Sequence, residues 1–161
     1  MKAFLSLGSN SGDREQYLIQ AIRALHNLEH TEVLESSSIY ETEPWGNENL
    51  DLFLNQVILI KTELSCFELL KQCKNIEKRY GRVKETGKWK ARTLDIDILV
   101  CNNQQISTDK LQVPHPLLTK RMFVLKPLSE LASDLIIPGI HKRVTEVMQT
   151  CDDPARVSLY K

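Results

Sequence analysis

The chain has 161 residues, of which 42% are hydrophobic and 26% charged, a composition that suits one globular domain able to bury its own core. Lysine plus arginine and aspartate plus glutamate both number 21, so no global field favours nucleic acid or an anionic membrane, and anion binding must be local. No apolar run approaches a membrane span and residues 1–2 lead directly into a strand-like segment, so we expect one cytoplasmic domain covering residues 1–161.

The chain begins with a predicted strand, a polar turn and a predicted helix. Residues 2–7 are mostly apolar and predict a short buried strand, which the turn at residues 8–13, Gly-Ser-Asn-Ser-Gly-Asp, ends. Apolar residues at helical spacing predict the helix, with either Asp13 or Ser11 as its N-cap. The glycine-containing turn invites comparison with a phosphate-binding loop, but it matches neither of the common patterns and is weak evidence by itself.

Two further strands follow. Residues 32–40 predict a second strand, and residues 42–49 are rich in breakers and predict a loop with an exposed Trp45. Such an aromatic is either surface decoration or part of a lid over a cleft. Residues 53–60 are apolar on both faces and predict a central strand. Asn55 interrupts this strand, and its amide is either tied to neighbouring backbone or offered to a polar ligand.

A second helix and a basic segment come next. Ser65 and Glu68 form a capping box that predicts the start of the helix, and Gly81 predicts its end. Basic residues then outnumber the single acid, Glu85. They are Lys78, Arg79, Arg82, Lys84, Lys88, Lys90 and Arg92. We expect residues 82–92 to be mobile without a ligand and to suit a polyphosphate, whose charge arginine and lysine neutralise.

The next strand carries two acids. Asp95 and Asp97 alternate with apolar residues, which are Leu94, Ile96, Ile98 and Val100. This period of two predicts that all the apolar side chains leave by one face and both carboxylates by the other. Residues two apart on a strand lie about 6.7 Å apart, so both carboxylates could reach a pair of divalent cations about 4 Å apart. Alternatively, Asp95 and Asp97 could simply lie on the solvent-exposed face of an ordinary half-buried strand. The basic segment before the strand favours a magnesium site for a polyphosphate.

The remainder of the chain is less regular. Residues 113–116, Val-Pro-His-Pro, must run extended because each proline disfavours helix before it, so His115 is held rigidly. Pro127 should interrupt any helix within residues 117–131. Residues 144–148 predict a short final helix. The order strand, helix, strand, strand, helix, strand favours the α+β class, a ferredoxin-like sandwich with a mainly antiparallel sheet, its helices, and C-terminal additions.

Two other functions fit parts of this pattern. A single-stranded RNA-binding module also uses such a sheet with basic loops, but it needs aromatics on the open strand face, where this chain carries Asp95 and Asp97. A nucleotidyltransferase combines Gly-Ser with a later Asp-x-Asp nearby in sequence, whereas Ser9 and Asp95 are far apart here. We therefore expect neither nucleic acid nor a membrane as a partner.

Four motifs occur in an order that carries a resemblance over essentially the whole chain. They are Leu7-Gly8-Ser9-Asn10, Gly81-Arg82, Arg92-Thr93-Leu94-Asp95-Ile96-Asp97-Ile98 and Val113-Pro114-His115-Pro116. Together they closely resemble the 6-hydroxymethyl-7,8-dihydropterin pyrophosphokinase family of folate biosynthesis. The resemblance implies a monomeric ferredoxin-like domain that binds ATP and two magnesium ions. It also implies transfer of the β,γ-pyrophosphoryl group to the pterin hydroxymethyl oxygen, which leaves AMP.

The same resemblance implies a role for individual residues. Asp95 and Asp97 would bind both magnesium ions and, with Arg82 and Arg92, form the catalytic group. The nucleotide would be held by Glu77, Arg82, Trp89, Arg92, Ile98, His115 and Arg121. Phe53 and Phe123 would sandwich the pterin ring, Asn55 would read its polar edge, and the site would also include Thr42 and Trp45.

The chain departs from this family mainly in its loops. Many relatives have Gly-Pro where this chain has Lys90-Ala91, an aromatic hydroxyl at the Phe53 position and an arginine at the Lys84 position. Trp45 and Pro116 also differ. We expect these changes to affect rates and loop order more than the reaction, because stacking on Phe53 survives without a hydroxyl.

Overall fold

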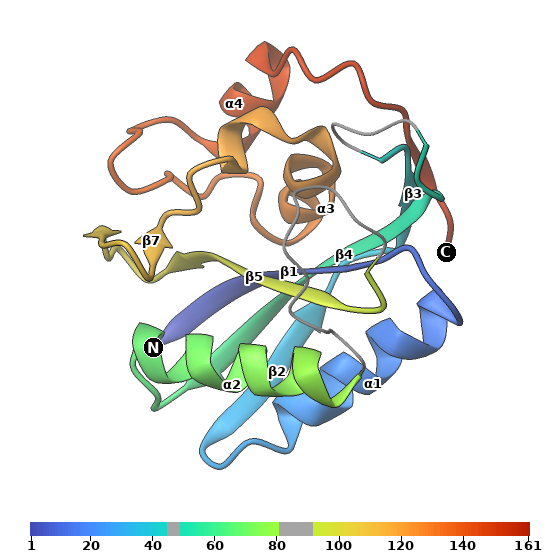
Figure 1. Ribbon diagram of the computed structural model, residues 1–161. Helices are drawn as coiled ribbons and strands as arrows, with labels where there is room; N and C mark the ends of the chain where they lie inside the picture. The colour runs from blue at the N-terminus through green and yellow to red at the C-terminus, as the bar shows by residue number, and fades with distance from the viewer. Residues whose placement is uncertain (45–48, 81–91) are drawn as a thin grey trace.

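A six-stranded sheet lies at the centre of the computed structural model, which describes residues 1–44, 49–80 and 92–161 (Figure 1). Strand β1 (Lys2–Ser9) lies between β4 (Phe53–Thr62) and β5 (Asp95–Cys101). The other edge of β4 pairs with β2 (Thr31–Ser36) and β3 (Tyr40–Thr42), and β8 (Val157–Leu159) adds to β3. Each of these pairings is antiparallel.

Helices cover both faces of the sheet. Helices α1 (Arg14–His26) and α2 (Cys66–Arg79) lie on one face, and α3 (Met122–Ala132) and α4 (Val144–Thr150) lie on the other (Figure 1). The β1–α1–β2 unit places β1 and β2 on either side of β4, and the β4–α2–β5 unit places β4 and β5 on either side of β1. This split arrangement confirms the predicted α+β, ferredoxin-like fold class.

Shorter elements follow β5. Strands β6 (Ile106–Ser107) and β7 (Gln112–Val113) pair with each other, and a 3₁₀ helix, η1 (Leu118–Lys120), leads into α3. Within the described ranges, no helix is long and apolar enough to cross a membrane.

The alternation of side chains along the strands builds two hydrophobic cores. On β1, Ala3, Leu5 and Leu7 are buried toward α1 and α2, where they join Leu18 and Leu69. On the opposite face, apolar strand residues pack against α3 and α4, and this core contains Val57, Leu99, Leu118, Val124, Leu125, Leu128, Ile137, Val144 and Val147. The second core fills only part of that face, so the rest of it is available for a site.

Both predicted helix starts are confirmed. Asp13 is the N-cap of α1, and its side chain accepts a hydrogen bond from the Gln16 amide at 3.2 Å. At α2, the Ser65 hydroxyl accepts from the Glu68 amide at 3.3 Å, and the Glu68 carboxylate accepts from the Ser65 amide at 2.8 Å. These bonds satisfy amides that have no partner within the helix.

The alternation predicted for β5 holds only as far as Ile98. Leu5 pairs with Ile98 and Phe4 pairs with Val100, so Leu99 is an extra residue in the strand. Such a bulge reverses the alternation of side chains. The prediction that Val100 shares a face with Ile98 was therefore wrong, since Val100 lies with Leu99 in the core beneath α3.

Two other local predictions were wrong. Helix α3 runs through Pro127, although proline cannot donate to the carbonyl four residues earlier and costs about 3 kcal/mol in a helix interior. The helix continues because Leu125 and Leu128, on either side of the proline, are fully buried in the core. The strand predicted at 32–40 is divided at Ser37, whose backbone and hydroxyl both bond Val57.

We predict that Ser65→Ala lowers the free energy of unfolding by about 1 kcal/mol, because the Glu68 amide at the start of α2 loses the hydroxyl that caps it. Urea denaturation monitored by circular dichroism measures this change. Ser107→Ala, at an exposed serine outside any helix, is the matched control and should change little. Equal effects of the two substitutions would contradict a capping role.

Candidate functional site

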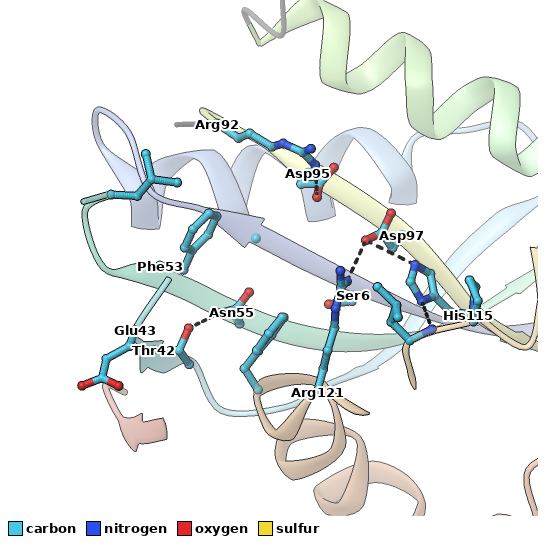
Figure 2. Close-up of a pocket in the computed structure, with 15 residues that line it drawn as sticks. Ser6, Thr42, Glu43, Phe53, Asn55, Arg92, Asp95, Asp97, His115 and Arg121 are labelled. Atoms are coloured by element: carbon cyan, nitrogen blue, oxygen red, sulfur yellow. Dashed lines mark hydrogen bonds and ion pairs between the residues drawn. The ribbon is translucent and has the colours of Figure 1, made fainter. Parts of the chain in front are cut away.

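A cavity of about 390 Å³ opens on the sheet face that carries α3 (Figure 2). Strands β1, β3, β4 and β5 contribute to its lining, together with the segment that leads from β7 into α3. Its lining residues are Ser6, Gly8, Thr42, Glu43, Leu50, Phe53, Asn55, Arg92, Asp95, Asp97, His115, Pro116, Leu117, Arg121 and Phe123. Residues far apart in the sequence therefore share one cavity.

Small residues on β1 create the floor of this cavity. Ser6 pairs with Asp97, and Gly8 pairs with Asp95 on one side and with Asn55 on the other. A Cβ atom added at Gly8 would lie 3.0 Å from the Asn55 side-chain oxygen, which is closer than nearly all such contacts. Glycine at this position therefore lets the Asn55 amide approach the sheet centre.

The two predicted acids both face the cavity, as the strand period required (Figure 2). The Arg92 guanidinium lies 2.6 Å from the Asp95 carboxylate, measured from Nη1 to Oδ2. Asp97 Oδ2 lies 3.8 Å from His115 Nε2 and 4.0 Å from Arg121 Nη1. Each carboxylate therefore has an arginine nearby.

Burial changes the acidity of the groups around Asp97. Burial raises the pKa of Asp97 to about 6, and repulsion from Asp95 adds to the rise. Burial lowers the pKa of His115 to about 4, and the positive charge of Arg121 adds to the fall. Near neutral pH the imidazole is therefore uncharged while Asp97 is mostly ionised. His115 Nδ1 accepts a hydrogen bond from the Leu117 amide at 3.1 Å, so the ring proton is on Nε2, which faces Asp97.

The acid pair fits a divalent cation. A cation between Asp95 and Asp97 would offset both their mutual repulsion and the cost of burying Asp97. Among the described residues, no group of three or more histidine, cysteine, aspartate or glutamate side chains could hold a metal. Two carboxylates alone suit magnesium, which usually keeps several waters and takes further ligands from substrate phosphates.

The other end of the cavity combines aromatic rings and a buried amide. Phe53, at the start of β4, and Phe123, at the start of α3, both line the cavity. Asn55 is buried, and its Nδ2 donates to the Thr42 hydroxyl at 2.6 Å (Figure 2). The sequence left two possibilities, a bond to neighbouring backbone or an amide offered to a ligand. Asn55 Nδ2 bonds a side chain and not neighbouring backbone, and the residue lines the cavity. The Arg121 guanidinium lies 5.6 Å from the centre of the Phe123 ring, between the aromatic and acidic ends.

Glu77 and Ile98 were assigned to the nucleotide, but neither lines the cavity. Glu77 is fully buried on α2, where its Oε1 accepts from the Ile96 amide at 2.8 Å and its Oε2 lies 3.2 Å from Lys74 Nζ. It therefore holds the backbone between the two aspartates. Ile98 is buried in the core toward α1 and α2.

Some assignments cannot be compared with the structure, and some lining residues had not been predicted. Arg82, Trp89 and Trp45 lie outside the described residues, as does most of the basic segment. The additional lining residues are Ser6, Gly8, Glu43, Leu50, Pro116 and Leu117. Small residues alternating with Leu5 and Leu7 on β1 were the available signal for Ser6 and Gly8.

The chain matches known proteins over most of its length. The family model described as 7,8-dihydro-6-hydroxymethylpterin-pyrophosphokinase (HPPK) matches residues 4–133. A Bacillus subtilis protein is 47% identical over 133 residues, covering 83% of this chain and 79% of its own length. An Aquifex aeolicus protein is 45% identical over 143 residues, covering 89% and 88%. Both are named 2-amino-4-hydroxy-6-hydroxymethyldihydropteridine pyrophosphokinase.

A solved structure supports the fold independently. The structure titled as an HPPK-DHPS in complex with substrates superposes with a TM-score of 0.72 over 92% of this chain, at 15% identity. This chain spans only 43% of that longer one, so the likeness concerns the fold of one part. From the family match, the two relatives and the shared fold, we conclude that the chain belongs to the 7,8-dihydro-6-hydroxymethylpterin-pyrophosphokinase family.

Proposed function

We propose that the cavity binds both substrates of the family's reaction, with the ATP polyphosphate at the acidic end and the pterin at the aromatic end. The chain transfers the pyrophosphoryl group of ATP to the hydroxymethyl oxygen of 6-hydroxymethyl-7,8-dihydropterin, a step of folate biosynthesis. The observation that carries the proposed arrangement is that carboxylates with arginines and aromatics with a buried amide line a single cavity. A phosphorus atom and an acceptor hydroxyl could therefore meet between the two ends.

At the acidic end, Asp95 and Asp97 would hold two magnesium ions together with the polyphosphate. When bound, these ions neutralise negative charge on the phosphates and make phosphorus more open to attack. Arg92 and Arg121 would add positive charge at the oxygens, and such charge counts most in a cavity that excludes water. The uncharged His115 can donate from Nε2 to a phosphate oxygen, since its Nδ1 is already occupied by Leu117.

At the aromatic end, Phe53 and Phe123 would stack on the two faces of the flat pterin. The ring buries its apolar faces in this way and leaves its polar edge for hydrogen bonds. With one Nδ2 hydrogen donated to Thr42, Asn55 keeps a side-chain oxygen that accepts and a second hydrogen that donates. This alternation of donor and acceptor matches the amide-like edge of a pterin.

A pterin bound at the aromatic end would bring its hydroxymethyl oxygen toward the polyphosphate. Holding the hydroxymethyl group between the two ends turns a collision of two solutes into a reaction within one complex. We further propose a cytoplasmic monomer that needs no nucleic acid or membrane. Two facts support this proposal: one chain supplies both ends of the cavity, and the chain has no net charge.

Incubation with ATP, magnesium and the reduced hydroxymethylpterin should yield AMP and the pterin diphosphate in equal amounts. Anion-exchange chromatography separates AMP from ADP and measures both. A reaction that yields ADP would indicate transfer of a single phosphoryl group and would overturn the proposed function. Omission of the pterin is the control, and it should leave ATP largely intact.

We predict that Asp95→Asn and Asp97→Asn each reduce turnover at least about 100-fold, because each removes a carboxylate charge that would hold magnesium against the polyphosphate. The folded structure should persist, since neither side chain contributes to a hydrophobic core. Asp134→Asn, at an exposed aspartate that lies 3.7 Å from Arg143, is the matched control. Rates of AMP formation and thermal unfolding curves give both readings, and near-normal turnover in either cavity variant would remove the metal assignment.

We predict that Phe123→Ala weakens pterin binding by about 1 to 3 kcal/mol, the scale of stacking between a base and an aromatic ring. Binding of a non-hydrolysable ATP analogue should change much less, because the ring is assigned to the pterin. Isothermal titration calorimetry with each ligand measures both affinities. Phe67→Ala, at an exposed phenylalanine on α2, controls for loss of an aromatic ring. Equal losses for the two ligands would move Phe123 from the pterin site to the core.

A further inference from the structure

Asn10, in the turn between β1 and α1, contacts two segments that lead into opposite ends of the cavity. The residue is only 1% exposed, and it does not line the cavity. The Arg92 backbone N–H donates to Asn10 Oδ1 at 2.6 Å, and the Asn10 backbone N–H donates to the Arg92 carbonyl at 3.0 Å. Asn10 Nδ2 donates to the Asp51 carbonyl at 3.3 Å. One residue is therefore bonded to both segments.

The bonds to Arg92 bear on the acidic end. Arg92 pairs with Asp95 at 2.6 Å, and the reach of its guanidinium depends on where its backbone is held. Two bonds between Asn10 and Arg92 fix that backbone against the end of β1, three residues before the first aspartate. Buried backbone groups of this kind are costly to leave without partners.

The bond to Asp51 bears on the aromatic end. Asp51 lies two residues before Phe53, and Leu52 between them is also held, because Nη1 of Arg14, the first residue of α1, donates to the Leu52 carbonyl at 2.8 Å. Arg14 Nη2 in addition lies 2.9 Å from Glu41 Oε2, next to Thr42. The turn after β1 and the start of α1 thus together hold the backbone that leads into Phe53.

We propose that Asn10 is a positioning residue that fixes the phosphate end of the cavity relative to the pterin end. Its side-chain oxygen sets Arg92, and its side-chain nitrogen sets the segment before Phe53. This inference rests on the proposed assignment of ATP and pterin to the two ends. It also gives a role to the Leu7-Gly8-Ser9-Asn10 motif, whose asparagine does not itself line the cavity.

The oxygen and the nitrogen of the Asn10 side-chain amide can be tested separately. Asn10→Ala removes both, so it should lower kcat and weaken pterin binding, each about tenfold, the worth of a buried hydrogen bond. Asn10→Asp keeps the acceptor for the Arg92 amide but places an oxygen against the Asp51 carbonyl. It should weaken pterin binding about as much while leaving the affinity for an ATP analogue with magnesium near the original value.

Steady-state kinetics and calorimetry with each ligand provide these readings, at a temperature where unfolding curves show every variant folded. Asn103→Ala, at an exposed asparagine in the turn after β5, is the matched control and should have the kcat and affinities of the unsubstituted protein. Arg14→Ala, which breaks only the Leu52 and Glu41 contacts, should weaken pterin binding and spare the ATP analogue. If Asn10→Ala does not fold, Asn10→Asp and Arg14→Ala still carry the test.

The proposal is supported if the aspartate variant loses pterin affinity alone and the alanine variant, where folded, loses kcat as well. It is overturned if folded Asn10 variants lose only stability while kcat and both affinities stay unchanged. It is also overturned if Asn10→Asp weakens the ATP analogue as much as the pterin. Failure of the original protein to bind either substrate or to form AMP would instead refute the proposed function.

Discussion

The register of β1 against its two neighbours is the constraint on which the site depends. β1 is central, and it sets Ser6 opposite Asp97 and Gly8 between Asp95 and Asn55. Because a strand alternates its side chains, the face that carries these small residues is opposite the one that buries Leu5 and Leu7. Space for ligands and a core of large apolar residues are therefore made by the same strand.

Any shift of this register would damage both functions of β1. A slip by one residue would turn the leucines toward the cavity and the small residues toward α1 and α2. The core thus protects the site, because the buried leucines allow only one pairing. The bulge at Leu99 lies just beyond the two aspartates, so the strand can change faces there without moving Asp95 or Asp97.

Charge is distributed unevenly within an otherwise neutral chain. The cavity concentrates two carboxylates with Arg92 and Arg121 at one end, whereas its other end is aromatic and uncharged except for Glu43. Burial makes each charge costly without a partner, as the raised pKa of Asp97 indicates. Such an arrangement is well suited to a polyphosphate bound with metal ions. The backbone supports beneath it, Glu77 on α2 and Asn10 after β1, keep these groups in place without lining the cavity.

Local patterns in the sequence determined the features that depend on near neighbours. The alternation around Asp95 and Asp97 predicted which face carries the acids, Ser65 and Glu68 predicted the start of α2, and the order of elements predicted the fold class. Tertiary structure decided what depends on residues far away in the chain. The bulge at Leu99 arises from pairing with β1, and α3 passes through Pro127 because its neighbours are buried. β8 was not anticipated, since its partner strand lies over a hundred residues earlier.

For the site, too, some features could be predicted from the sequence and others were decided by tertiary structure. The alternation on β5 and the basic segment before it indicated Asp95, Asp97 and Arg92 as a site for a metal and a polyphosphate. The other predicted lining residues, Phe53 and Phe123 among them, came from the resemblance to the family. Only the fold revealed that Glu77 bonds the backbone between the aspartates and that Asn10 joins Arg92 to the segment before Phe53. Hydrogen bonds to backbone leave little trace in a sequence, since the backbone partner is the same for almost every residue type. Which carbonyl or amide lies within reach is set by the packing of the whole chain.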